Sequence, residues 1–142
     1  MTRLRVVVHD LPQARAALAA AAASGLEIEL VSAPGAAKYA GVGFLAALGR
    51  HVGREILVDC GEDAGLVLAG LRTGLRRLVF RGGGEVLAKL QDIAAQLGAE
   101  VLAAVEPPVL ALAPHDAPDR AIGAWLARQD EDDGGPNIGG GD

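Results

Sequence analysis

Short runs of apolar residues recur along the chain, and a helical or loop pattern follows each of them. Most of these runs are continuous rather than alternating, which is typical of strands that are covered on both faces. Strands of this kind pair in parallel. The runs predict five strands, at residues 4–8, 26–31, 55–58, 78–80 and 101–105.

Apolar positions at helical spacing fill the intervals between these runs. The clearest pattern lies in residues 85–97, where apolar residues form one face and charged or amide residues form the opposite one. The same period covers residues 64–75, and a weaker version covers residues 37–48. Residues 11–24 are mostly Ala and Leu, which favour helix. The sequence therefore predicts a helix in each of four intervals between five strands.

Glycine marks the end of each helical pattern. Gly25, Gly53, Gly74 and Gly98 each lie one or two residues before a strand, where a left-handed helix cap needs glycine. Repeated βα units with right-handed crossovers predict an α/β protein with a three-layer α/β/α arrangement and a mostly parallel five-stranded sheet, of the flavodoxin-like or Rossmann-like type. We expect one domain over residues 1–128.

The last third of the chain is less regular. Two prolines stop the fifth strand, and residues 109–113 fit either a short additional strand or a loop. A final helix follows Pro118, with Ile122 and Trp125 on its apolar face. Residues 129–142 are acidic and rich in Gly, and because they offer little to bury, we expect a disordered tail.

Composition narrows the range of partners. The formal net charge is −5 and the sequence pI is about 5.1, so we expect no nucleic-acid partner, since such binding needs a concentrated basic surface. The only basic cluster is Arg72, Arg76 and Arg77. It straddles the end of a predicted helix, where cations meet the helix dipole favourably, so we interpret it as structural.

Cysteine usage and hydropathy suggest the compartment. The single Cys60 excludes an intramolecular disulfide and any multi-cysteine zinc site, which fits a reducing environment. Apolar stretches are broken by Gly or charged residues well short of the roughly 20 residues that a membrane span needs. We therefore expect a cytoplasmic protein with no membrane partner.

Ligands of open parallel sheets bind beyond the carboxyl ends of the strands, so we expect a site to lie in the loops there. Asp10 and Asp59 follow the first and third strands and would hold a hard cation if the two carboxylates met. The alternative, which we favour, is that Asp10, with Glu62 and Asp63, caps a helix N-terminus. No metal site is therefore predicted.

Cys60 has two possible roles. Beside a helix start it would act as a nucleophile if His9 or His115 served as its base. The alternative, which we favour, is that Cys60 is simply buried. No catalytic residue is assigned from the sequence.

The second candidate site is a glycine-rich turn. Arg81, Gly82, Gly83 and Gly84 lead directly into the clearest helix, whose free N–H groups and positive dipole end would receive a phosphate or carboxylate. The segment matches neither the dinucleotide-binding fingerprint nor the P-loop, so a plain turn remains the alternative. With Asp10, Asp59 and Cys60, these four residues form the hypothetical ligand-binding set.

The order of elements resembles that of response-regulator receiver domains, which have a flavodoxin-like fold. Asp10 and Asp59 end the first and third strands, and Gly98 precedes a strand that leads to Glu106. The resemblance implies magnesium bound near the first acidic residue and phosphate accepted by the second. Arg81 and Glu106 replace the family's Ser or Thr and its Lys, which implies a relative that is independent of phosphorylation.

No motif identifies a reaction or a cofactor. The sequence therefore favours a non-enzymatic regulatory or interaction module, expected to be a homodimer because of its apolar content. The alternative is a small enzyme or ligand-binding protein with an anion site at the carboxyl ends of the strands.

Overall fold

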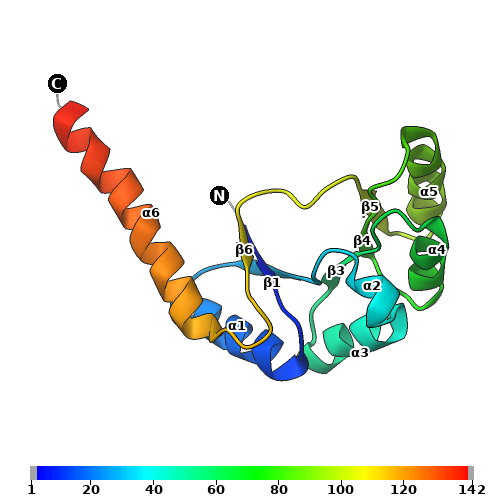
Figure 1. Ribbon diagram of the computed structural model, residues 1–142, viewed down its shortest axis with the longest axis horizontal. Coiled ribbons are helices and arrows are strands. Elements are labelled where there is room, and N and C mark those ends of the chain that lie inside the picture. Colours follow the sequence, from blue (N-terminus) through cyan, green and yellow to red (C-terminus); the bar gives the residue numbers. More distant parts are fainter. Residues whose placement is uncertain (1–2, 141–142) are drawn as a thin grey trace.

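The computed structural model describes residues 3–140, with the side chains of residues 3–131. Six strands and six helices alternate along most of the chain (Figure 1). In order they are β1 (Leu4–Val7), α1 (Leu11–Ala23), β2 (Ile28–Val31), α2 (Ala36–Tyr39), α3 (Val42–Val52), β3 (Ile56–Asp59), α4 (Ala64–Arg72), β4 (Arg77–Val79), α5 (Gly84–Gln96), β5 (Glu100–Leu102), β6 (Val109–Ala111) and α6 (Pro118–Gly140).

The predicted α/β class and parallel sheet are confirmed. All strands of the described residues pair in parallel, in the order β5-β4-β3-β2-β1-β6. The sheet has six strands instead of five, because the segment that the sequence left open forms β6 beside β1. In the flavodoxin-like order, 2-1-3-4-5, β1 lies between β2 and β3. Here β2 lies between β1 and β3.

This order places the crossover helices on one face of the sheet. Each step from β1 to β5 moves in the same direction, and right-handed crossovers in one direction all pass over the same face. Gly49 of α3 lies against the Ile56 side chain and Gly70 of α4 against that of Leu78. Because Val58 pairs with Leu78, these side chains share a face. Figure 1 shows α1, α3, α4 and α5 on one side of the sheet.

The opposite face is crossed by the connection between β5 and β6, residues 103–108 (Figure 1). Its Val105 is half-buried against the core, and Glu106 lies 3.7 Å from Arg5. The covering layer on this side is therefore an extended segment and not a helix. Small residues of the Ala-rich α1 pack closely on the other side, with Ala14 and Ala17 fully buried.

A buried ionic network closes the amino-terminal end of the sheet on this opposite face. The Glu29 side chain is 4% exposed, and its carboxylate accepts hydrogen bonds from Arg5 and Arg77, while Arg77 also pairs with Glu100. Burial acts to lower the pKa of Arg77, but the hydrogen bond and charge of Glu29, followed by those of Glu100, raise it above its ordinary value. The network links β1, β2, β4 and β5.

The last helix, α6, packs on α1. Ile122 is 1% exposed, and Trp125 and Leu126 are half-buried, so the apolar face predicted for this helix is confirmed. The helix extends past the start of the predicted tail at residue 129. The side chains of residues 132–142 lie outside the described residues, and the disorder expected for this tail stays a prediction. No helix in the described part of the chain is long and apolar enough to cross a membrane.

Candidate functional site

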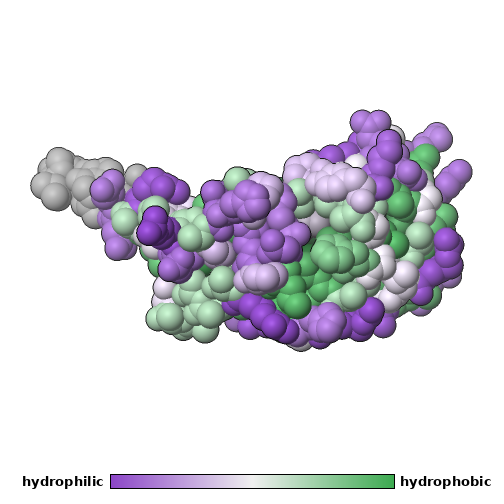
Figure 2. Space-filling view, turned by 60° about the horizontal axis from the view of Figure 1, so that its bottom comes forward, coloured by the Kyte–Doolittle hydropathy of each residue, from purple (hydrophilic) through white to green (hydrophobic). Residues whose placement is uncertain are grey.

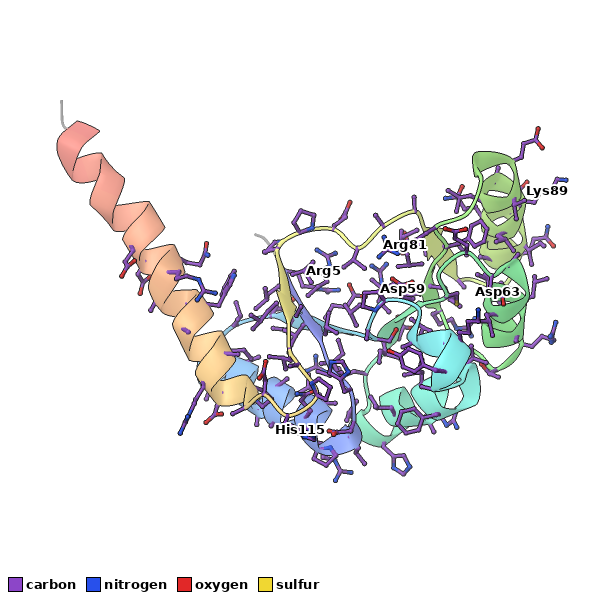
Figure 3. All side chains as sticks on the ribbon, viewed as in Figure 1. Arg5, Asp59, Asp63, Arg81, Lys89 and His115 are labelled. Carbon is purple, nitrogen blue, oxygen red and sulfur yellow. The ribbon has the colours of Figure 1, made fainter. Side chains whose placement is uncertain are left out.

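The carboxyl ends of β3 and β4 carry a buried ion pair (Figure 3). The Asp59 side chain is 1% exposed and that of Arg81 is 40% exposed. Arg81 donates from Nε and from Nη2 to the Asp59 Oδ2 atom, at 3.0 Å and 2.8 Å. Two bonds from one planar guanidinium fix both side chains, so this pair joins two predicted site residues.

Backbone bonds surround this ion pair. The Gly61 N–H donates to the Asp59 Oδ1 atom at 2.8 Å, and the Arg81 N–H donates to the Gly61 carbonyl at 2.7 Å. The Asp59 N–H donates to the buried Ser32 Oγ atom at 2.8 Å. Both carboxylate oxygens are therefore used, and the loops after β2, β3 and β4 are tied into one unit.

Asp10 lies apart from this unit. It follows β1, and β2 separates β1 from β3, so the two candidate carboxylates are not at neighbouring strand ends. Asp10 caps α1 by accepting the Gln13 N–H at 2.8 Å, and Asp63 likewise caps α4. The capping interpretation is confirmed for these two residues. No group of His, Cys, Asp or Glu side chains among residues 3–131 is arranged to hold a metal ion.

Gln13 is a structural residue that the sequence did not reveal. Its side chain amide donates to the carbonyls of Ala113 and Asp116, and its oxygen accepts the His9 N–H. The His9 ring also bonds the Leu112 carbonyl at 2.7 Å. These bonds join the loop after β6 to the loop after β1. His9 therefore has a structural role at the contact between these two loops.

Cys60 is buried, and no histidine within residues 3–131 is hydrogen-bonded to it. It is 2% exposed, and no hydrogen bond in the described part of the chain joins it to His9 or His115. Burial, and after it the charges of Asp59 and Asp63, raise the pKa of the Cys60 thiol from 9.0 to about 12. The expectation of simple burial fits this geometry.

We predict that Cys60 is protected from alkylation. At pH 8 the thiolate should be roughly a thousandfold scarcer in the folded protein than in the unfolded chain, because thiolate concentration follows the pKa. Iodoacetamide labelling, followed by mass spectrometry, should therefore be at least about a hundredfold slower in buffer than in guanidinium. Equal rates would contradict this burial.

The same shift predicts the pH dependence of stability. Below pH 9 the thiol is protonated in both states, so its effect on stability is constant. Above pH 9 the unfolded chain loses this proton, while the folded state keeps it until about pH 12. Stability should thus fall as the pH rises through this window.

The glycine turn before α5 has one constrained position and two open ones. A Cβ atom on Gly82 would lie 2.3 Å from the Phe80 ring, so this glycine permits the ring to pack beneath the turn. A Cβ atom on Gly83 or Gly84 would meet nothing within 4 Å. The N-cap of α5 is Gly83, and no side chain within residues 3–131 caps this helix. The turn is open, but the Nε and Nη2 donors of Arg81 are taken by Asp59.

An open hollow of about 410 Å³ lies beside the ion pair, at the ends of β2 and β3. Gly35 and Gly61 line it together with Lys38, Glu62 and Asp63. The side chains of Lys38 and Glu62 take part in no hydrogen bond or ion pair within residues 3–131. The hollow therefore has small residues at its base and opposite charges at its rim.

Two aromatic side chains shortly after Lys38 in the sequence are exposed. Tyr39, which follows Lys38 at the end of α2, is 71% exposed, and Phe44 in the first turns of α3 is 48% exposed. Figure 2 shows apolar surface gathered over the side of the molecule where α3 lies. The chain has four aromatic residues in all, so half of them lie on this surface. Phe44 contributes to the weak helical pattern of residues 37–48, but nothing in the sequence marks either residue as exposed.

Comparisons with protein-family models, with curated proteins and with solved structures found no match for this chain. The geometry of its own residues carries the functional argument.

Proposed function

We propose that this chain is a non-enzymatic interaction module that works as a homodimer. The observation that carries the proposal is the exposure of Tyr39 and Phe44, which lie on α2 and α3 and follow Lys38 of the hollow closely in sequence. Aromatic rings bury large areas and are enriched at protein interfaces, so their exposure on a chain with few aromatics favours a docking surface.

The candidate chemical groups support a non-enzymatic role. Asp59 is held by Arg81 and Gly61, and the thiol of Cys60 is buried with a raised pKa. Both lack the accessible, reactive form that catalysis needs. The burial of Asp59 also argues against phosphoryl transfer at this residue, because both oxygens of its carboxylate already accept hydrogen bonds from Gly61 and Arg81.

A second copy of the chain is the partner that this surface fits. A two-fold interface brings the same patch together from both copies, so it must be self-complementary. Here the rim supplies Lys38 on one side and Glu62 on the other, and the hollow supplies space beside an exposed ring. In a two-fold dimer, Tyr39 of each copy enters the hollow of its partner, and Lys38 faces the partner's Glu62.

Sedimentation velocity tests this interface. The wild-type chain should show a dimer whose proportion rises with concentration, and Tyr39→Ser with Phe44→Ser should weaken it at least about tenfold, since buried aromatic anchors contribute more than about 1.4 kcal/mol. Both side chains are exposed in the isolated chain, so the fold should be unaffected.

The matched control is Val86→Ser with Val109→Ser. These side chains are 41% and 40% exposed, but they lie on α5 and β6, away from the hollow. Their substitution should leave the dimer intact. A monomeric wild type would refute the homodimer, and an equal loss in both pairs of variants would refute this location.

A second candidate function is binding of a small anion at Arg81, Gly82, Gly83 and Gly84. The observation in its favour is the N-terminus of α5, which no side chain caps, and the open space at Gly83. Gly83→Leu fills that space without a clash and without a change of backbone region, so it is the cleanest test. Arg81→Ala is unsuitable because it also leaves Asp59 unpaired.

A cytoplasmic location is part of the proposal. It rests on the single Cys60, which stays a free thiol in this fold. Reducing compartments keep such thiols free.

A further inference from the structure

A second hollow, of about 380 Å³, lies at the opposite edge of the sheet, where β3 and β4 begin. It falls between the turn from α3 to β3 and the turn from α4 to β4, and Arg50, Arg54 and Arg76 line it. Its volume is in the range of small-molecule sites, roughly 300 to 1,000 Å³. The rule that ligands of parallel sheets bind beyond the carboxyl ends of the strands does not apply to this edge.

Positive charge gathers at this edge. Helix C-termini and strand N-termini meet here, and more than half of the 13 Lys and Arg residues of the chain lie beside them. They are Arg3, Arg5, Arg50, Arg54, Arg72, Arg76 and Arg77. Arg3, Arg5 and Arg77 have carboxylate partners, whereas the other four have none within residues 3–131. An acidic protein thus has a local cationic surface.

Part of this cluster has a structural role. Arg76 donates to the Leu97 carbonyl at the end of α5, and Arg50 lies in the last turn of α3. Arg76 thus satisfies a helix C-terminus, in keeping with its structural interpretation, and Arg50 lies where the dipole of α3 favours a cation. Arg54 follows the helix cap, and its side chain makes no hydrogen bond within the described residues. It also lines two smaller hollows along the same edge.

The balance of charge in the hollow remains positive. Three arginines face one carboxylate, Glu55, and the C-termini of α3 and α4. Each helix end is equivalent to about −0.5 of a charge, so the net charge is about +1 before any ligand binds. Gly49 and Gly53 add no side chains to the turn, and a Cβ atom on Gly49 would lie 2.8 Å from the Arg54 carbonyl. The close approach of these two backbone segments therefore requires glycine at position 49.

We propose that this hollow binds a small phosphorylated ligand, of the size of a diphosphate, through Arg50, Arg54 and Arg76. Guanidinium groups bind phosphate oxygens in a bidentate geometry, and three of them around one cavity can contact two phosphoryl groups. The backbone N–H groups of Gly53 and Arg54 are already bonded within the turn, so side chains supply the donors. This site is independent of the proposed dimer surface.

Titration of the full-length protein with inorganic pyrophosphate tests the site. Calorimetry should detect one site per chain, and the melting temperature should rise by roughly 3 to 5 °C at ten times Kd. Arg54→Ala should weaken binding at least about tenfold, since a hydrogen bond to a charged group is being lost. The exposed Arg15 on α1 provides the control, because Arg15→Ala removes an equal charge far from the hollow and should leave Kd unchanged.

Gly83→Leu separates this site from the glycine turn before α5. Pyrophosphate binding that survives Gly83→Leu and is lost in Arg54→Ala supports the inference. Three results would overturn it: no heat of binding at millimolar pyrophosphate, binding unchanged by Arg50→Ala with Arg54→Ala, or binding lost in Gly83→Leu alone. The last of these would instead favour the second candidate function, and none of them affects the dimer experiment.

Discussion

Arg81→Ala should lower the free energy of unfolding by about 3 kcal/mol, with a fall in Tm of roughly 10 °C. The reason is that Asp59 would stay buried, with its side chain 1% exposed, after losing the guanidinium that neutralises it. Removal of one partner from a buried ion pair costs roughly 3 to 5 kcal/mol, and we expect the lower end because Arg81 itself is 40% exposed. Urea denaturation measures the change.

A second substitution identifies the cause. Asp59→Asn in the Arg81→Ala background should recover part of the loss, because the amide carries no charge and its oxygen still accepts the Gly61 N–H. Arg15→Ala should stay within about 0.5 kcal/mol of wild type, as is usual for surface positions. If Arg81→Ala were equally mild, the ion pair would have no structural role.

Glu29→Ala should cost about 3 kcal/mol as well, at the other end of the sheet. Glu29 is the shared acceptor of Arg5 and Arg77, whose side chains are 14% and 19% exposed. Without it, two largely buried guanidinium groups keep only the exposed carboxylates of Glu106 and Glu100. Thermal and urea unfolding should both show the loss.

Glu100→Ala is the matched control for this network. It removes a carboxylate from the same arginine, Arg77, but Glu100 is 62% exposed. Exposed pairs contribute at most about 1 kcal/mol, so the effect should be much smaller than that of Glu29→Ala. Equal effects of the two substitutions would show that burial of Glu29 is not what matters.

The strands and helices were predictable because they depend on local patterns. Continuous apolar runs identified five strands, and glycines such as Gly53 and Gly98, with φ of +69° and +72°, ended the helical segments as expected. The order of strands was not predictable, since the direction of each crossover leaves no trace in the hydrophobic period. The position of β6 beside β1 depends on a connection, residues 103–108, that has no regular pattern.

The candidate site was predictable only in part. The rule for parallel sheets brought Asp59, Cys60 and Arg81 to one edge. It could not show that Arg81 is bonded to Asp59, which lies 22 positions before it in the sequence. Asp10 was assigned to the same group because the sequence does not reveal that β2 lies between β1 and β3.

One signal for the missed network was present in the sequence. Arg5 and Glu29 are charges within apolar strand runs, and Arg77 directly precedes the run at residues 78–80. Charged residues are almost never buried unless they are paired, so opposite charges in buried strands imply one another. Tyr39, Phe44 and Arg54 gave no such signal, because exposure of a side chain depends on tertiary packing.

The dimer surface is tested most directly by hydrogen exchange of the wild-type protein at increasing concentrations. The proposal predicts that amides of α2, the start of α3 and the loop after β3 gain protection as the concentration rises, because a second copy covers them. Amides of α5 should exchange at the same rate throughout. Protection that is independent of concentration, or that rises at α5 and not at α2, would contradict the proposed interface.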